Sequence, residues 1–316
     1  MVVSRTSMKV RGYALVTVSS FYSLMATPFS TSHSSLVSSS SSNTIKKVSL
    51  LLHSDAKTSA WDVQRYQDQH SFVWEYGADL IDLMAPFVPG ERILDVGCGT
   101  GVLSAQIAQK QNDLTVVGMD SDLAMVTQAR QQFPHLTFVH DDVRTLSQHH
   151  PHHQERYDAI FSNAALHWVP PQDVVQSVMA MSSVLKPQGR FVVEFGGQGN
   201  VQTILDAVQQ VLPNSQNPWY FPSISHYTTI LEQHGQMQVL FAALFDRPTR
   251  LTDENNGITN WLRMFGSSFV QHIHDENKVD EVLQQIQDRC KSHLYDAQSK
   301  QWTADYRRIR IVAKKM

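Results

Sequence analysis

The sequence predicts an α/β fold built on a mostly parallel β-sheet with helices on both faces. Short apolar runs alternate with helical patterns between residues 92 and 195, which is typical of strands joined by right-handed helical crossovers. The first run leads into three alternating glycines and then into a helical pattern, an arrangement found in ligand-binding α/β proteins. The chain has 316 residues, 42% of them hydrophobic, so it is long enough to bury a sizeable core.

The predicted elements follow one another in a regular order. Apolar residues at helical spacing between residues 63 and 84 predict a first helix, which Pro86 and the pair Pro89-Gly90 end. The apolar runs that predict strands lie at residues 92–96, 114–119, 136–140, 157–162 and 190–195, and helices are expected between them at 102–109, 123–132 and 172–185. Two more helices (201–212, 223–234), a strand (238–245) and a final strand (307–314) complete the prediction.

Two segments lie outside this alternation. Residues 251–302 have mostly helical patterns, at 258–265 and 278–293, and we expect them to form a helical insertion or cap over the sheet of a domain that spans residues 55–316. Residues 1–54 are rich in serine and contain five basic residues but no acidic residue. This composition predicts a disordered targeting presequence for a mitochondrion or plastid. If the leader carries no address, a cytoplasmic location is expected.

Composition argues against several classes of protein. The formal net charge is −3, and without the five leader cations the body carries about −8, which disfavours binding to a nucleic-acid backbone. No stretch approaches the ~18 consecutive apolar residues of a membrane-spanning helix. The two cysteines, Cys98 and Cys290, are too few for a disulfide framework or a cysteine-rich metal site. The histidine-rich segment 149–153 has no second ligand cluster, and we interpret it as a solvated loop, so no metal site is predicted.

The glycine-rich segment is the most informative part of the sequence. Gly97, Gly99 and Gly101 follow a predicted buried strand. Glycine is required where the backbone turns sharply and a ligand must lie against it. Asp95 precedes the loop, where it would repel a pyrophosphate but could meet an ammonium group. This acid and the G-x-G-x-G spacing favour a nucleoside with a positively charged tail over a nicotinamide dinucleotide.

Polar residues also end the next three predicted strands. Asp120, about 20 residues after the loop, is suited to a ribose diol. Asp142 is placed to accept a hydrogen bond from an exocyclic amine such as that of adenine, and Asn163 ends the fourth strand. Because ligands of open α/β sheets bind at the carboxyl ends of the strands, these residues predict one nucleoside site.

These motifs resemble those of the class I S-adenosylmethionine-dependent methyltransferases over residues 58–250. The matching segments are D-V-G-C-G-T-G (95–101), G-M-D (118–120), S-N-A-A-L-H-W (162–168) and L-K-P-Q-G-R-F (185–191). Trp61-Asp62, Tyr66 and residues 163–170 resemble the trans-aconitate methyltransferase-like group. The resemblance implies a Rossmann-like seven-stranded sheet whose last strand is antiparallel, with residues 307–314 returning beside 238–245. Gln188 departs from the pattern, since many relatives have glycine there.

The resemblance also implies roles for individual residues. The glycines would line the methionine and ribose parts of S-adenosyl-L-methionine, Asp95 would lie near its amino group, Asp120 would hold the ribose hydroxyls, and Asp142 the adenine amine. Asn163 and Ala164 would lie beside the sulfonium, and Trp61 and Tyr66 would cap the site. The complete cofactor-binding set implied is Trp61, Tyr66, Asp95, Gly97, Cys98, Gly99, Gly101, Asp120, Ser121, Asp142, Val143, Asn163 and Ala164.

The acceptor is less well defined by the sequence. Methyl transfer to a carboxylate needs no general base, because a carboxylate is already ionised at pH 7, whereas an amine, phenol or thiol usually needs one. His167 is the candidate base, with a packed polar residue as the alternative. Arginine grips carboxylates bidentately, so Arg247, Arg250 and Arg263 are candidates for binding an anionic acceptor, and surface arginines are the alternative. Trp168 and Tyr220 complete the candidate acceptor residues.

These observations favour an S-adenosylmethionine-dependent methyltransferase that acts on a small molecule, by O-methylation of a carboxylate such as trans-aconitate. Methylation of a carrier-bound acyl carboxylate is a second hypothesis, although we find no basic docking patch in the sequence. A non-catalytic assembly or interaction protein with this fold is the third, and the intact glycine loop argues against it. The sequence leaves the oligomeric state open.

Overall fold

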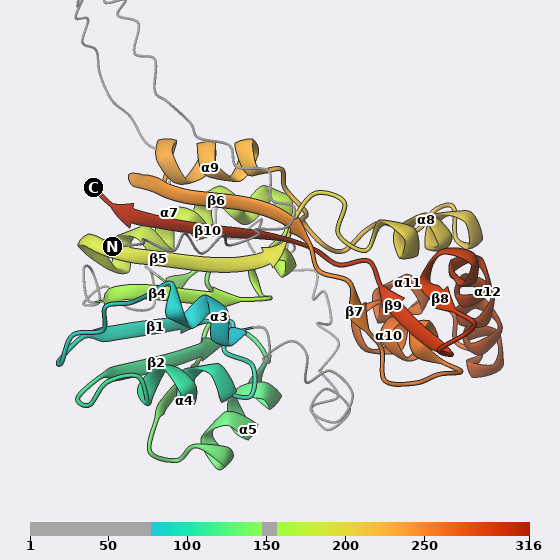
Figure 1. The fold of residues 1–316 in the computed structure, drawn as a ribbon, viewed down its shortest axis with the longest axis horizontal. Helices are drawn as coiled ribbons and strands as arrows, with labels where there is room; N and C mark the ends of the chain where they lie inside the picture. Colours follow the sequence, from blue (N-terminus) through green and yellow to red (C-terminus); the bar gives the residue numbers. More distant parts are fainter. Residues whose placement is uncertain (1–76, 147–156) are drawn as a thin grey trace, which may run out of the picture. The chain divides into compact units, whose positions relative to one another are not determined.

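The central feature of the structure is a seven-stranded sheet. The computed structural model describes residues 77–146 and 157–316, and within them the strand order is β3-β2-β1-β4-β5-β10-β6 (Figure 1). Strands β1 to β5 pair in parallel, whereas β10 lies antiparallel to both β5 and β6. The expected seven-stranded sheet with an antiparallel last strand is therefore confirmed. The strands are β1 (Arg92–Val96), β2 (Thr115–Asp120), β3 (Thr137–His140), β4 (Tyr157–Asn163), β5 (Leu185–Gly196), β6 (Met237–Asp246) and β10 (Arg307–Lys315).

Helices cover both faces of this sheet. The larger core cluster packs apolar residues of α7 (Val174–Val184) and α9 (Ile224–Gln233) against one face. On the opposite face, α3 (Gly77–Asp82) and α4 (Val102–Ala108) pack against the central strands, and α5 (Leu123–Gln132) packs on β3. Short 3₁₀ turns, η2 (Leu166–Trp168) and η3 (Pro171–Asp173), lead from β4 into α7. This burial of parallel strands on both sides explains why they read as continuous apolar runs.

The predicted boundaries differ from the observed ones by at most two residues, except at the start of β5 and in the first helix. Strand β5 begins at Leu185, which pairs with Tyr157, and not at residue 190. Gln188 adopts a left-handed conformation with φ 65° within this first part of the strand. Residues 186–189, which were predicted to end the preceding helix, therefore already belong to β5. The register between β4 and β5 shifts between Tyr157 and Ala159.

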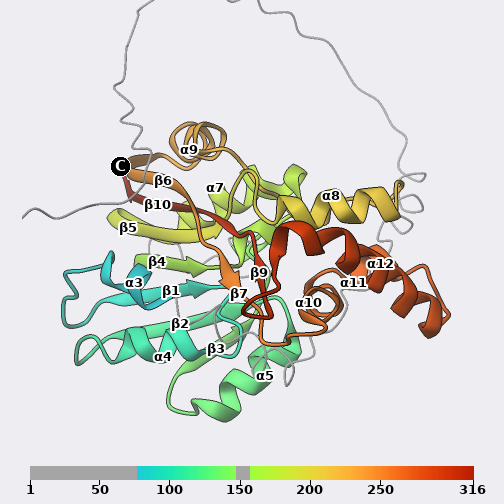
Figure 2. The ribbon, with the colours of Figure 1, turned by 45° about the vertical axis from the view of Figure 1, so that its right-hand side comes forward.

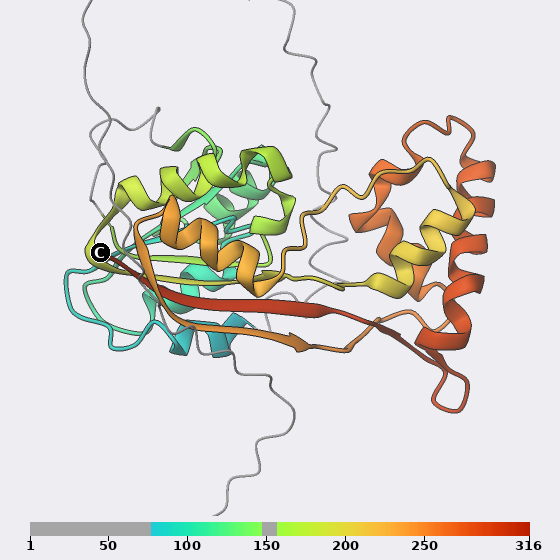
Figure 3. The same ribbon diagram turned by 90° about the horizontal axis from the view of Figure 1, so that it is seen from above.

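A second group of elements forms the cap. It contains α10 (Gly257–Phe265), α11 (Ser267–Val270), α12 (Glu276–Leu294) and a small antiparallel sheet of β7 (Thr249–Arg250), β9 (Gln301–Ala304) and β8 (Tyr295–Asp296). Helix α8 (Gln202–Val211) packs against α12, so the cap includes residues from before the predicted 251–302 insertion. Figure 2 shows β7 and β9 beside the cap helices, and Figure 3 shows the long red strand β10 leading back to the large sheet.

The buried Gln287 of α12 stabilises the start of α10. Its Oε1 accepts hydrogen bonds from the backbone N–H groups of Ile258 at 3.1 Å and Thr259 at 3.2 Å, and its Nε2 donates to the carbonyl oxygen of Asn255 at 2.8 Å. The N-cap residue of α10, Asn256, makes no side-chain capping bond. Gln287 therefore satisfies helix-terminal donors that a local cap would normally bind.

Three predictions lie wholly or largely outside the described residues. These are the presequence 1–54, the first helix before Gly77, with Trp61 and Tyr66, and the histidine-rich segment 149–153. Within residues 77–146 and 157–316, no helix is both long and apolar enough to cross a membrane.

Candidate cofactor and acceptor site

The glycine loop turns sharply between β1 and α4. Gly97 has φ 73°, and a Cβ there would lie 2.1 Å from the Cβ of Ala165. Gly101 has φ 81°, and its Cβ would lie 2.6 Å from the ring of Phe138. These two glycines are required by the fold. Gly99 differs, because no heavy atom lies within 4 Å of the position its Cβ would take, so the loop is open at its centre, where a ligand can approach the backbone.

Asp120, at the end of β2, is bound to this loop. Its Oδ2 accepts a hydrogen bond from the Gly99 N–H at 2.9 Å, and its Oδ1 accepts one from the Asp122 N–H at 2.9 Å. Burial raises the pKa of the Asp120 carboxyl above 3.8 despite these bonds. The glycine loop therefore holds the Asp120 carboxylate at the carboxyl end of β2.

Asp95 is a buried residue next to the end of β1. It is 2% exposed and accepts a hydrogen bond from the Ser104 hydroxyl of α4 at 2.5 Å. Burial raises its pKa from 3.8 to about 7; the Ser104 bond opposes this shift, and the nearby Asp120 charge adds to it. A bound ammonium group would favour the ionised form of such a carboxyl.

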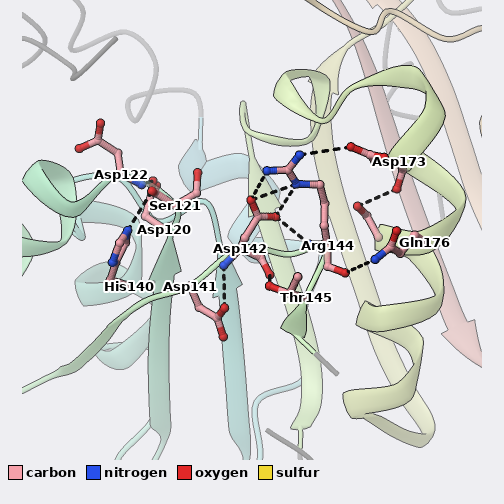
Figure 4. Close-up of polar contacts among 11 residues, drawn as sticks. Asp120, Ser121, Asp122, His140, Asp141, Asp142, Arg144, Thr145, Asp173 and Gln176 are labelled. Carbon is pink, nitrogen blue, oxygen red and sulfur yellow. Dashed lines mark hydrogen bonds and ion pairs between the residues drawn. The ribbon is translucent and has the colours of Figure 1, made fainter. Parts of the chain in front are cut away.

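Asp142 follows β3 and is held by Arg144, as Figure 4 shows. The Arg144 Nε lies 2.9 Å from Oδ1 and 3.0 Å from Oδ2, and Nη2 lies 2.6 Å from Oδ2. The backbone N–H of Asp142 donates to Asp141 Oδ1 at 2.7 Å. Val143 is buried beside these acids in the main core cluster. The candidate adenine acceptor is thus fixed in direction before any ligand binds.

The other predicted cofactor residues lie around these acids. Asn163 ends β4 and is partly exposed, and Ala164 has φ 56° and donates its N–H to the Glu194 carbonyl oxygen at 2.7 Å. Ser121 is exposed after β2, and its carbonyl oxygen lies 3.1 Å from His140 Nε2. Cys98 packs with Phe138 and neighbouring apolar residues, and burial raises its pKa, so a nucleophilic role is disfavoured.

An S-adenosyl nucleoside fits the chemistry of this edge. An open glycine, carboxylates at the ends of β1 and β2, and a carboxylate after β3 lie at the same edge, where parallel α/β sheets bind ligands. Carboxylates suit a ribose diol, an amine and an ammonium tail, whereas they would repel a pyrophosphate. The residues present therefore fit this cofactor.

His167 is buried in η2 near the end of β5. Its Nδ1 lies 3.4 Å from the Gly196 nitrogen, whose N–H points to it, and its ring contacts the rings of Trp168 and Phe221 at centroid distances of 5.7 and 5.8 Å. Burial, with the nearby Arg308 charge, holds its pKa well below 6.5. His167 is neutral at pH 7, and the nitrogen that could accept a proton already receives a hydrogen bond. The structure thus favours the packed polar residue over the general base.

Trp168 and Tyr220 are both near this histidine. Trp168 packs against Trp219 of the cap cluster at a centroid distance of 5.7 Å. The Tyr220 N–H donates to the His167 carbonyl oxygen at 2.9 Å. The Tyr220 hydroxyl is buried and makes no hydrogen bond within the described residues, and burial raises its pKa to about 12. It is therefore protonated at pH 7 and can act as a hydrogen-bond donor.

The candidate arginines have partners that the sequence did not reveal. Arg247 forms an ion pair with the buried Glu194 of β5, which also accepts a bond from Arg310 at 2.6 Å. Arg263 pairs with Asp280 of α12, and Arg250 is an exposed residue of β7. Arg263 therefore links two cap helices, and no described contact ties it to an acceptor. Arg247 is still at the carboxyl edge, after the end of β6, but its charge is shared with Glu194.

The sequence motifs did not indicate four residues that contact the candidate site residues: Ser104, Arg144, Glu194 and Arg308. Arg144 could have been found from the sequence, since a basic side chain two residues after an acidic one in a turn can form an ion pair with it. Glu194 is a charge in an otherwise apolar run, which is itself a signal of a buried partner. Ser104 and Arg308 gave no such signal.

Comparison with known sequences agrees with the motifs. Residues 93–189 match the family described as "Methyltransferase domain". The chain is 29% identical over 273 residues to an uncharacterized methyltransferase of Schizosaccharomyces pombe, covering 81% of this chain and 98% of that one. It is 36% identical over 137 residues to a trans-aconitate 2-methyltransferase of Deinococcus radiodurans, covering 42% and 48% of the two chains. This match thus spans about half the length of that enzyme.

Solved structures show the same fold. A putative methyltransferase from Bacillus halodurans superposes with a TM-score of 0.52 at 17% identity, covering 75% of this chain and 97% of that one. An N-methyltransferase from Haemonchus contortus in complex with S-adenosylhomocysteine superposes with a TM-score of 0.51 at 14% identity, covering 80% and 56%. With the methyltransferase motifs, the matching methyltransferase domain and this sheet, the chain is a class I S-adenosylmethionine-dependent methyltransferase that is similar to the trans-aconitate methyltransferases over part of its length.

Proposed function

We propose that this methyltransferase O-methylates a carboxylate group of a small molecule, with a polycarboxylate such as trans-aconitate as the first acceptor to test. The observation that carries the proposal is the state of His167, which is neutral and already receives a hydrogen bond at Nδ1. A site in which His167 is not a poised base suits an acceptor that is ionised at neutral pH. The relatives named trans-aconitate 2-methyltransferase support the same acceptor class.

The residues at the carboxyl edge have defined tasks in this reaction. Bound S-adenosylmethionine supplies a methyl group on a charged sulfonium. Transfer of that methyl group to a carboxylate oxygen of the acceptor, with cleavage of the carbon–sulfur bond, would give a methyl ester and S-adenosylhomocysteine. Asp95, Asp120 and Asp142 would bind and orient the nucleoside, and the loop after β4, at Asn163 and Ala164, would lie beside the reacting centre. The protein contributes alignment and exclusion of water rather than proton transfer.

The acceptor would bind on the β5 side of the site. The Tyr220 hydroxyl is a buried donor that can bind an acceptor carboxylate. Arg308 is 7% exposed, and its guanidinium lies over the ring of Tyr306 and close enough to His167 to affect its pKa. Arg247 and Arg310 share the single carboxylate of Glu194. The arginines on this side of the site provide positive charge, which favours an anionic acceptor.

The test is an assay of the purified protein with methyl-labelled S-adenosylmethionine and three acceptor sets: polycarboxylates, amines and phenols. We expect label to enter the polycarboxylates and to be released as methanol by mild alkali, because methyl esters hydrolyse and methylated amines or phenol ethers do not. Alkali-stable product from the amines or phenols, with none from carboxylates, would contradict the proposal.

A variant tests the acceptor residue separately from the cofactor site. Tyr220→Phe removes one hydroxyl and keeps the ring, so the KM for the carboxylate should rise several-fold while the affinity for S-adenosylhomocysteine stays the same. Trp302, whose indole N–H donates to the carbonyl oxygen of Glu254 inside the cap, provides a matched aromatic control as Trp302→Phe, for which no change in acceptor KM is expected.

A further inference from the structure

We infer that Arg144 is a positioning residue for recognition of the adenine amine, acting through the carboxylate of Asp142. The inference rests on the proposed placement of the cofactor, and it adds a residue that neither the motif nor the resemblance assigned. It also extends the site from the end of β3 to the start of α7.

Arg144 binds Asp142 in a way that fixes both the position and the plane of its carboxylate. The side-chain Nε is shared between Oδ1 and Oδ2 at 2.9 and 3.0 Å, and Nη2 lies 2.6 Å from Oδ2. The backbone N–H of Arg144 also donates to Oδ1 at 2.8 Å. A planar guanidinium that binds both oxygens prevents rotation of the carboxylate, which a single point charge would not do.

These bonds also restrict how a further donor can approach Asp142. A carboxylate offers about four acceptor sites, and three N–H groups of Arg144, one main-chain and two side-chain, bind to its two oxygens. An exocyclic amine that donates to Asp142 must therefore approach from a direction that the bonds to Arg144 set.

Arg144 is itself held from the opposite side. Its Nη1 donates to Asp173 Oδ2 at 3.2 Å, and its carbonyl oxygen accepts a bond from Gln176 Nε2 at 2.8 Å. Asp173 ends η3 and Gln176 belongs to the first turn of α7. Figure 4 shows this chain of contacts from Asp142 through Arg144 to Asp173 and Gln176. Both the main chain and the side chain of Arg144 are therefore anchored to a helix that packs on the sheet.

A purely structural role for Arg144 makes a different prediction. Asp142 also forms a local turn, with its carbonyl oxygen accepting the Thr145 N–H at 3.0 Å. If Arg144 only stabilised this turn, its loss would weaken binding of every nucleoside ligand alike. If it positions Asp142, its loss would weaken binding of ligands that carry the exocyclic amine more than binding of ligands that lack it.

The experiment compares two ligands by calorimetry on the full chain: S-adenosylhomocysteine, and S-inosylhomocysteine, in which a carbonyl oxygen replaces the amine. The wild-type protein should prefer the adenosyl compound by roughly tenfold to a hundredfold, the range of one charge-assisted hydrogen bond. Arg144→Met should reduce this preference to less than about threefold by weakening adenosyl binding and leaving inosyl binding nearly unchanged. Arg144→Lys, which keeps a charge but not the fork, should give an intermediate preference.

Two further variants complete the test. Arg130→Met is the matched control, because this arginine of α5 binds the carbonyl oxygen of Phe138 at 2.8 and 3.1 Å and contacts neither acid of the network; it should keep the full preference. Asp142→Asn should lose the preference, and adding Arg144→Met to it should reduce the preference no further. An Arg144→Met protein that keeps the wild-type preference, binds adenosyl ligand more tightly, or loses both ligands equally would overturn the inference. This experiment measures ligand binding without an acceptor. A negative result here can therefore be distinguished from a negative result in the carboxylate methylation assay.

Discussion

Replacing Asp95 by asparagine should make the protein more stable at alkaline pH and yet weaken its cofactor binding. Asp95 is almost fully buried, with the Ser104 hydroxyl as its hydrogen-bond partner and Asp120 nearby. Burial raises the pKa of its carboxyl to about 7. In the unfolded chain the carboxyl titrates near its ordinary value of 3.8, so between these two pH values the folded protein binds a proton that the unfolded chain does not.

The direction and size of the effect follow from that difference. Stability that comes from a raised carboxyl pKa is fully present below the unfolded value and is lost as the pH rises through the folded value. With a folded pKa of about 7, proton linkage predicts that this residue alone lowers the free energy of unfolding by about 2 kcal/mol between pH 5.5 and 8.5. Asparagine does not titrate, so the Asp95→Asn protein lacks this loss.

Urea unfolding of both proteins at pH 5.5, 7.0 and 8.5 measures the effect. Other groups titrate in both proteins, so the informative quantity is the stability of Asp95→Asn minus that of the parent, which should become more favourable to the variant by about 2 kcal/mol from the lowest to the highest pH. Binding of S-adenosylhomocysteine at pH 7.5 should weaken by about tenfold, because asparagine offers its amino group no charge.

A pH-independent difference between the two proteins would refute the reasoning about Asp95. It would mean that the carboxyl titrates alike in the folded and unfolded states, and that its burial is offset by hydrogen bonding. Unchanged affinity of the Asp95→Asn protein for S-adenosylhomocysteine would contradict the proposed contact between Asp95 and the cofactor. It would not affect the conclusion that burial raises the pKa of Asp95.

Four further predictions concern other parts of the chain. Asp120→Asn should weaken binding of S-adenosylhomocysteine by roughly tenfold to a few hundredfold in calorimetry, and undiminished affinity in a folded variant would contradict the assigned role. Gln287→Leu should lower the free energy of unfolding by about 2 kcal/mol, because two buried N–H groups of α10 lose their acceptor; Gln287→Glu, which keeps an acceptor, should lose less, and equal losses would exclude this explanation. Gln188→Gly should raise stability by about 1 kcal/mol, since the exposed residue has a positive φ that glycine adopts without strain, and a destabilised variant would show that its side chain has another role. If residues 1–54 are a cleaved presequence, protein from its native source should lack residues 1–20, and mass spectrometry that finds them intact would count against import.

The parts of the fold that sequence could predict are those that depend on neighbours along the chain. Strand β1, the glycine loop and α4 follow from apolar runs and from glycines whose positive φ angles are local properties of a tight turn. Asp95 and Asp120 could be recognised because their distance from that loop along the chain is fixed by the crossover between two strands.

The acceptor side could not be predicted in this way, because its charges are paired across the chain. Arg247 and Glu194 are 53 residues apart, and Arg263 and Asp280 come from different helices. A single sequence gives the number of arginines but not their partners, and a guanidinium that neutralises a buried carboxylate looks the same in sequence as one that binds a ligand. The state of His167 likewise depends on Gly196 and Arg308, which reach it from β5 and β10.

The position of β10 between β5 and β6 has a consequence for how the molecule is made. Among the described strands of the large sheet, β6 pairs only with β10, so its backbone pairing must wait until residues 307–315 have been synthesised. By then every residue of the cap has been synthesised. Lys315 then completes the structure, with its ammonium donating to the carbonyl oxygens of Ser182 and Leu185 at the end of α7, both at 2.9 Å. During translation the nascent chain therefore carries β6 and α9 on an unfinished sheet edge, which is the kind of surface that chaperones bind.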